Sequence, residues 1–140
     1  MPTYNNLDTL LEHAVRDYLK NGGVDNPYHA VSDLDLTLPA VICSCSGGEE
    51  FPMGSGNFWQ NVTVKVISPG NATDLDAHKT YCAQVFDLLL AETFIDDLNT
   101  SANGIGFQGF RNRRYSATSI EDRKWVSEMT LDLLSCATEF

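Results

Sequence analysis

Long apolar stretches are missing from this sequence. No run approaches the roughly 18 residues that a membrane-spanning helix needs, so we expect no membrane segment. The first twenty residues also lack a basic start followed by an apolar stretch. We therefore expect no secretory signal and a reducing, cytoplasmic site of synthesis and assembly.

Basic residues are scarce. Nine Lys and Arg stand against 19 Asp and Glu, which gives a net charge of −10 and an isoelectric point near 4.4. Proteins that bind nucleic-acid phosphates need a basic surface, so this charge argues against that class. An acidic surface instead repels DNA and keeps it from sticking.

The cysteine spacings of redox and zinc motifs are absent as well. Among the four cysteines the closest pair, Cys43 and Cys45, is spaced C-x-C rather than C-x-x-C. In an extended segment that spacing places both thiols on one face. We predict free cysteines, no metal and no cofactor, with a zinc site completed by Cys82, Cys136 or His78 as the alternative.

Patterns typical of catalysis are also lacking. His13 and His78 lie in expected helices, with no serine or cysteine that suggests a nucleophile pair, so we expect structural histidines. Residues 104–109 match G-x-G-x-x-G, but they follow a helix and lead into arginines, without the helix start that a dinucleotide site requires. We predict that the protein is not an enzyme.

The composition is that of one compact domain spanning 1–140. With 43% hydrophobic and 10% aromatic residues, a chain of 140 residues can bury a core without disulfides or metal. Two segments are expected to be flexible loops. Residues 24–38 are irregular and contain three aspartates, and residues 47–57 are interrupted by four glycines and Pro52.

Hydrophobic periodicity predicts two helices and four strands. An apolar stripe at helical spacing runs through residues 4–20, and a second runs through 72–98. Alternation or β-prone composition indicates four strands, although helix competes with strand for the last; the strands are 40–46, 58–68, 104–116 and 124–136. We predict an α+β fold, a four-stranded, mainly antiparallel sheet with two helices packed on one face and a polar second face.

Most of the basic charge is concentrated near the C-terminus. Five cations and two carboxylates give residues 111–124 a charge of +3, which leaves −13 for the rest of the chain; the cations are Arg111, Arg113, Arg114, Arg123 and Lys124. The segment is either a solvated face or a contact surface for an acidic neighbour, with DNA as a third interpretation. Another copy of this chain is the nearest acidic neighbour, and complementary patches make head-to-tail contacts that can close into rings. On that interpretation, reversing the charges of Arg113 and Arg114 should weaken self-association.

A partner-facing loop is predicted at the acidic, glycine-rich segment; its candidate residues are Glu49, Glu50, Phe51 and Met53. This loop and several other short motifs occur in a characteristic order. They are Leu38-Pro39, the acidic loop, Gly56-Asn57 before the valine strand Val62-Val64-Val66, Asp74 and His78 at the start of the long helix, and Glu121-Asp122-Arg123-x-Trp125 before a strand ending in Cys136.

In this order of motifs, over most of 38–136, the chain resembles the tail terminator (tail-completion) proteins of tailed bacteriophages. The resemblance implies a small α+β subunit of the virion tail and neck, without an active site. Such subunits form a ring, typically a hexamer, that caps the tail tube protein and joins it to the head-side connector or head-completion protein. DNA would pass through the ring without specific binding. The alternatives are a head-completion or neck subunit of a phage, or a small-ligand-binding or enzymatic cytosolic α+β domain.

Overall fold

The computed structural model describes residues 7–24, 27–29 and 38–137. Among them, no helix has the length and apolar character that crossing a bilayer requires. The fold is α+β, as predicted, but the described residues form three α-helices and six strands rather than two and four. Most of the predicted loop at 24–38 lies outside the described residues.

The first helix, α1 (Leu7–Asn21), was predicted from its apolar stripe. Leu11, Val15 and Leu19 point into the core and are fully or almost fully buried. The helix ends where expected, because Gly23 adopts a φ of 92° that favours glycine. There the amide of Val24 donates to the carbonyl of Leu19 at 3.0 Å.

The second predicted helix, 72–98, is wrong as one continuous helix. A short 3₁₀ turn (Ala72–Asp74) leads into α2 (Leu75–Leu89), and a separate α3 (Phe94–Ser101) follows. The break turns Phe94 and Leu98 into the core, where both are buried. The ring of Phe94 meets that of Tyr18 of α1 edge-on, with centroids 5.2 Å apart. The chain therefore changes direction between α2 and α3 at the point where Phe94 becomes buried against α1.

The sheet has the order β1-β2-β3-β6-β4, with β5 also paired to β6. All pairs are antiparallel except β1 with β2. The strands are β1 (Pro27–His29), β2 (Ala40–Glu50), β3 (Phe58–Pro69), β4 (Ile105–Tyr115), β5 (Ser119–Glu121) and β6 (Lys124–Ala137). The strand prediction for 124–136 is confirmed over the helix alternative. Both unpredicted strands, β1 and β5, have only three residues, too few to show a period of two.

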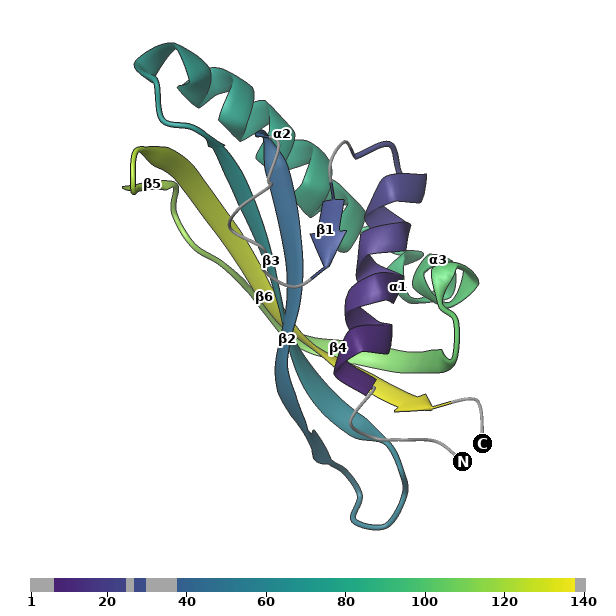
Figure 1. The fold of residues 1–140 in the computed structure, drawn as a ribbon. Coiled ribbons are helices and arrows are strands. Elements are labelled where there is room, and N and C mark those ends of the chain that lie inside the picture. The colour runs from purple at the N-terminus through teal and green to yellow at the C-terminus, as the bar shows by residue number, and fades with distance from the viewer. Residues whose placement is uncertain (1–6, 25–26, 30–37, 138–140) are drawn as a thin grey trace.

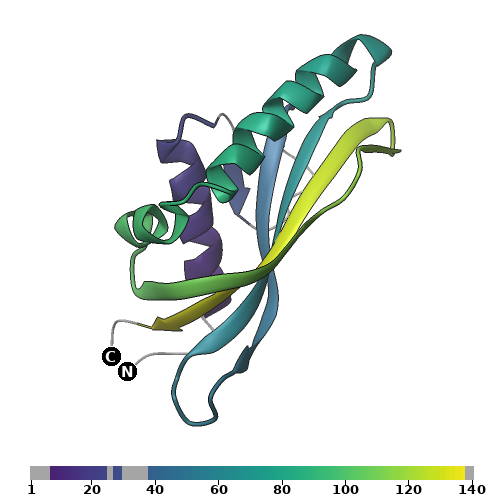
Figure 2. The same ribbon diagram turned by 180° about the vertical axis from the view of Figure 1, so that it is seen from behind.

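The helices cover one face of the sheet and leave the other uncovered (Figures 1 and 2). On the covered face Val62, Val64 and Val66 are fully buried, as their alternation predicted. The outer face carries Asn61 and Thr63 from the same strand, in keeping with the predicted polar second face. One end of this outer face is instead apolar and buried, and it consists of Ala40, Ile42, Ile67 and Val126.

The hairpin formed by β2 and β3 projects beyond the helices, at the bottom of the view in Figure 1. We call its outer part, residues 46–61, the arm. The prediction of a flexible loop over 47–57 is wrong for its first four residues, because β2 continues to Glu50 and pairs with β3. Gly47, with φ of 109°, lies in a bulge between Cys45 and Gly48 that lets the strand continue.

Candidate interaction surfaces

The tip of the arm is closed by hydrogen bonds from its own backbone. The Glu50 carboxylate accepts the amide of Gly54 at 2.8 Å and that of Gly56 at 3.0 Å. The amide of Phe51 donates to the carbonyl of Asn57 at 2.9 Å. Glu50 was predicted to face a partner, but its carboxylate is used to shape this loop.

Apolar side chains are presented to solvent by the same tip. Phe51 is 63% exposed and Met53 is 94% exposed. Exposed large apolar side chains on a projecting element are typical of protein contact sites. Phe51 and Met53, together with exposed Glu49, therefore remain candidates for the predicted partner-facing loop.

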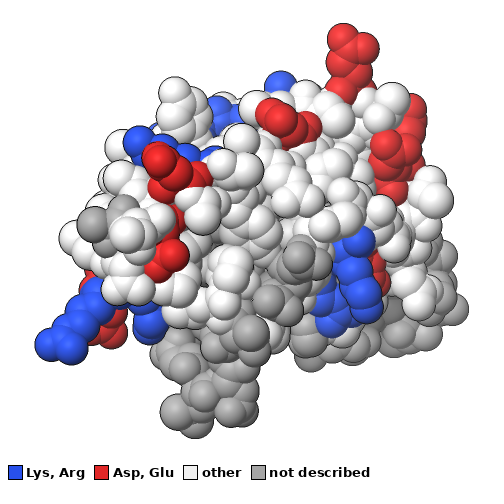
Figure 3. Space-filling model, turned by 90° about the horizontal axis from the view of Figure 1, so that it is seen from above, with Lys and Arg blue, Asp and Glu red and all other residues white. Residues whose placement is uncertain are grey.

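The basic residues do not form one patch. Arg111, Arg113 and Arg114 lie on β4, whereas Arg123 lies in the turn between β5 and β6. Arg114 pairs with Thr130 of β6, and the β5–β6 turn adjoins Lys124. Six residues along a strand separate the two places by about 20 Å. Acidic and basic side chains are likewise scattered in small groups on the surface in Figure 3.

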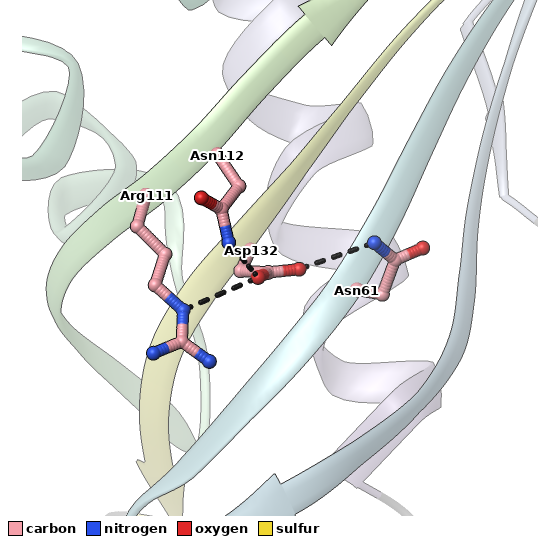
Figure 4. A network of polar contacts seen from close by, with 4 residues as sticks. All are labelled: Asn61, Arg111, Asn112 and Asp132. Carbon is pink, nitrogen blue, oxygen red and sulfur yellow. Dashed lines mark hydrogen bonds and ion pairs between the residues drawn. The ribbon is translucent and has the colours of Figure 1, made fainter.

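Arg111 is held in a polar network on the outer face of the sheet (Figure 4). Its Nε lies 3.3 Å from the carboxylate of Asp132, which also accepts the side-chain amides of Asn61 at 3.1 Å and Asn112 at 3.0 Å. Burial alone would raise the pKa of Asp132, but these hydrogen bonds and the Arg111 charge outweigh it and hold the pKa below its ordinary value. The Arg111 guanidinium also lies 4.1 Å from the ring centroid of Trp59.

Arg113 points the other way, toward the helices. A β-bulge around Asn112, whose φ is 57°, separates the two arginines. Arg113 Nη1 lies 3.3 Å from the carbonyl of Leu89, and its guanidinium lies 4.2 Å from the Phe110 ring centroid. A cation at the last carbonyls of α2 stabilises the helix end. Arg113 therefore has a structural role within the chain.

Arg114 and Arg123 differ from these two. Within residues 7–24, 27–29 and 38–137 neither guanidinium has a hydrogen-bond or ion-pair partner, and both side chains are exposed. Of the four predicted contact arginines, these two have cationic groups that the described chain does not use. Sequence reasoning could not separate the four, because the partners of Arg111 and Arg113 lie more than twenty residues away.

His78 is the centre of a buried polar cluster. Its Nδ1 lies 2.7 Å from Ser68 Oγ and its Nε2 lies 3.0 Å from Ser127 Oγ. His78 and both serines are at most 3% exposed. Burial lowers the pKa of His78 below its ordinary value. The ring joins α2 to β3 and β6 and is closed to solvent, an arrangement in keeping with the structural histidine that the sequence predicts.

Cys43 and Cys45 lie on the same face of β2, as predicted, and this is the face that the helices cover. Burial raises the pKa of both Cys43 and Cys45 to about 12, so the thiols stay protonated. The Cys45 thiol lies 3.4 Å from Asp8 Oδ1 of α1, to which it donates. Among the described residues no cluster of His, Cys, Asp or Glu is arranged to hold a metal ion.

No protein-family model matches this chain, and no curated protein matches it. The likeness to tail terminator proteins therefore rests on the sequence motifs. The geometry adds the exposed apolar tip of the arm and two separate exposed cations, Arg114 of β4 and Arg123 of the β5–β6 turn.

Proposed function

We propose that this chain is a virion structural protein, the tail terminator of a tailed bacteriophage. Copies form a ring that caps the tail tube and joins it to the head-side connector. The observation that carries the proposal is the arm, which projects from the body and presents Phe51 and Met53 on a loop closed by Glu50 (Figure 1). A projecting hairpin of this kind suits docking on another protein.

Each surface has a place in this proposal. The apolar tip of the arm contacts the tail tube protein, and the strands at the two sides of the sheet contact neighbouring copies. The net charge of −10 disfavours adhesion of a passing DNA duplex. No side chain makes or breaks a bond, and no cofactor is required.

The proposal is tested with the purified chain and with purified tails that lack a terminator. Native mass measurement and negative-stain electron microscopy should reveal closed rings, free or at the end of the tube. A chain that neither self-assembles nor binds tube ends would overturn the proposal. Binding to isolated connectors but not to tubes would instead favour the head-completion or neck alternative.

A further inference from the structure

The turn between β5 and β6 holds an arginine in an unfavourable backbone conformation. Glu121 pairs with Lys124, so two residues make the connection. They are Asp122, with φ of 52°, and Arg123, with φ of 63°. Two-residue hairpin turns with positive φ at both positions favour Asn or Asp followed by Gly. Asp122 fits this preference, whereas the Cβ of Arg123 makes its left-handed conformation costly, so the chain carries an arginine where glycine is the more stable choice.

The backbone of this turn is fixed against the chain that follows β3. A Cβ built on Gly70 would lie 2.1 Å from the carbonyl oxygen of Arg123, so the two backbones are in direct contact there. Next to this contact, the indole nitrogen of Trp125 donates to the carbonyl of Asn71 at 2.8 Å. The position of Arg123 is therefore set before any partner binds, which lowers the entropy that binding would lose.

The side chain of Arg123 is not used by the described chain. Within those residues its guanidinium has no hydrogen-bond or ion-pair partner, and the residue is exposed. On the preceding strand Ile120 is 56% exposed. An arginine near an exposed apolar side chain is typical of protein contact sites. Strained residues cluster at functional sites, and this one contributes no contact to the fold, so the turn is a candidate contact site.

The turn and the arm lie at opposite ends of the sheet (Figure 1). The first residue of β3, Phe58, pairs with Glu50 of the arm. Its last residue, Pro69, pairs with Lys124 beside the turn. The length of β3, 12 residues, separates the two places by about 35 Å. A subunit that joins two bodies needs a contact at each end, and in the proposed ring the arm supplies the contact with the tail tube.

We propose that Arg123 anchors the ring to an acidic surface of the head-side connector, an assignment that rests on the proposed function and names the residue and chemistry of its second contact. A guanidinium binds a carboxylate through two parallel hydrogen bonds, which suits an arginine whose backbone is already fixed. DNA phosphate is the less favoured partner, because the net charge of −10 repels a duplex.

Replacement of the arginine by glycine separates binding from stability. We expect Arg123→Gly to raise Tm by about 3 °C, because relief of the left-handed strain outweighs the extra freedom of glycine in the unfolded chain. The same variant should lower the yield of joined particles about tenfold. Arg123→Glu keeps the strained backbone and should lower the yield further without raising Tm. The assay mixes tail tubes capped with each variant with purified tailless heads, and negative-stain electron microscopy counts the joined particles.

Asp122→Gly is the matched control. It relaxes the same turn and keeps the guanidinium, so joining should stay within about twofold of the original chain. An equal loss of joining with Asp122→Gly and Arg123→Gly would assign the effect to the backbone of the turn and overturn the proposed role of the charge. Normal joining with Arg123→Glu would overturn it as well.

Failure of this contact is distinguishable from failure of the proposed function. Rings that cap tubes and join heads normally with every variant would exclude Arg123 and leave the ring intact. Loss of ring formation or of tube capping with Arg123→Glu would instead place the arginine in one of those contacts. Retention of the original chain on double-stranded DNA, lost with Arg123→Glu, would assign the guanidinium to phosphate and overturn the acidic protein partner. A chain that neither assembles nor caps tubes would overturn the function and the contact together.

Discussion

At the scale of single residues, the buried imidazole of His78 has hydrogen-bond partners from distant parts of the chain. His78 of α2 is satisfied by Ser68 of β3 and Ser127 of β6, and the Ser127 hydroxyl also meets Thr118 Oγ1 at 2.8 Å. A buried imidazole with two hydroxyl partners is stable as the neutral form, whereas its charged form has lost hydration. The cluster therefore links pH to folding.

We predict that protonation of His78 destabilises the folded protein. Above pH 6.5 the imidazole is neutral in both states and contributes no pH dependence. Below it, the unfolded chain binds a proton that the folded chain resists, because the folded pKa is lowered. The free energy of unfolding should then fall by at most about 1.4 kcal/mol per pH unit, down to the folded pKa.

Urea unfolding between pH 7.5 and 5 measures this dependence, with His78→Gln as the comparison. Contributions from the rest of the chain are common to both proteins and cancel in the difference. Asp132, with its lowered pKa, contributes stability that is lost only in the more acidic range below the ordinary carboxyl pKa. A His78 imidazole resonance that titrates at pH 6.5 or above would contradict the prediction without reference to the variant.

At the scale of elements, short hydrogen-bonded contacts decide what the arm can present. The Glu50 carboxylate holds the amides of Gly54 and Gly56, both of which have positive φ. The carboxylate is thus bound on one side of the loop while Phe51 and Met53 extend from it. Glu49, its neighbour, faces outward and does not contact these amides.

We predict that Glu50→Ala loosens the tip and leaves the body of the fold intact. Loss of the charged acceptor should speed amide exchange at Gly54 and Gly56 about tenfold, which corresponds to about 1.4 kcal/mol of local stability. Nuclear magnetic resonance exchange rates measure this directly. Glu49→Ala is the matched control and should leave both rates unchanged; equal effects of the two substitutions would refute the role assigned to Glu50.

At the scale of the whole molecule, the surface that we propose for partner binding is separate from the surfaces that keep the chain folded. The tip of the arm lies beyond the helices in both ribbon views. The core instead joins the helices to the covered face of the sheet through residues such as Leu11, Phe94 and Leu131. Substitutions at the tip can therefore be separated from effects on folding.

We predict that the double substitution of Phe51→Ser and Met53→Ser abolishes binding to tube ends. Both side chains are exposed, so the free energy of unfolding should change by less than about 0.5 kcal/mol. Self-assembly should persist, because in the proposed ring the tip contacts the tail tube and not the neighbouring copies. Co-sedimentation with terminator-deficient tails measures binding, and Ile120→Ser, another exposed apolar position, is the control. Normal binding by the double variant would exclude the tip from the contact.

Local periodicity was sufficient to predict the main elements. The stripe through α1 and the alternation in β6 each extend over ten or more residues, and the valines of β3 alternate from Val62 to Val66. The spacing of apolar residues is a property of each segment by itself, and it shows which side of a helix or strand will be buried. The α+β class could therefore be predicted from the sequence. The chain's acidity and its lack of long apolar stretches were likewise properties of the sequence alone.

Tertiary contacts decided what periodicity could not. Three-residue β1 and β5 pair with the long strands β2 and β6, and α3 separates from α2 where Phe94 packs on α1. The roles of the arginines diverged for the same reason, since Arg111 meets Asp132 and Arg113 meets Leu89 only after the sheet has assembled. The stability of these elements and side-chain contacts depends on partners that are remote in sequence and close in space. Only the folded chain brings those partners together.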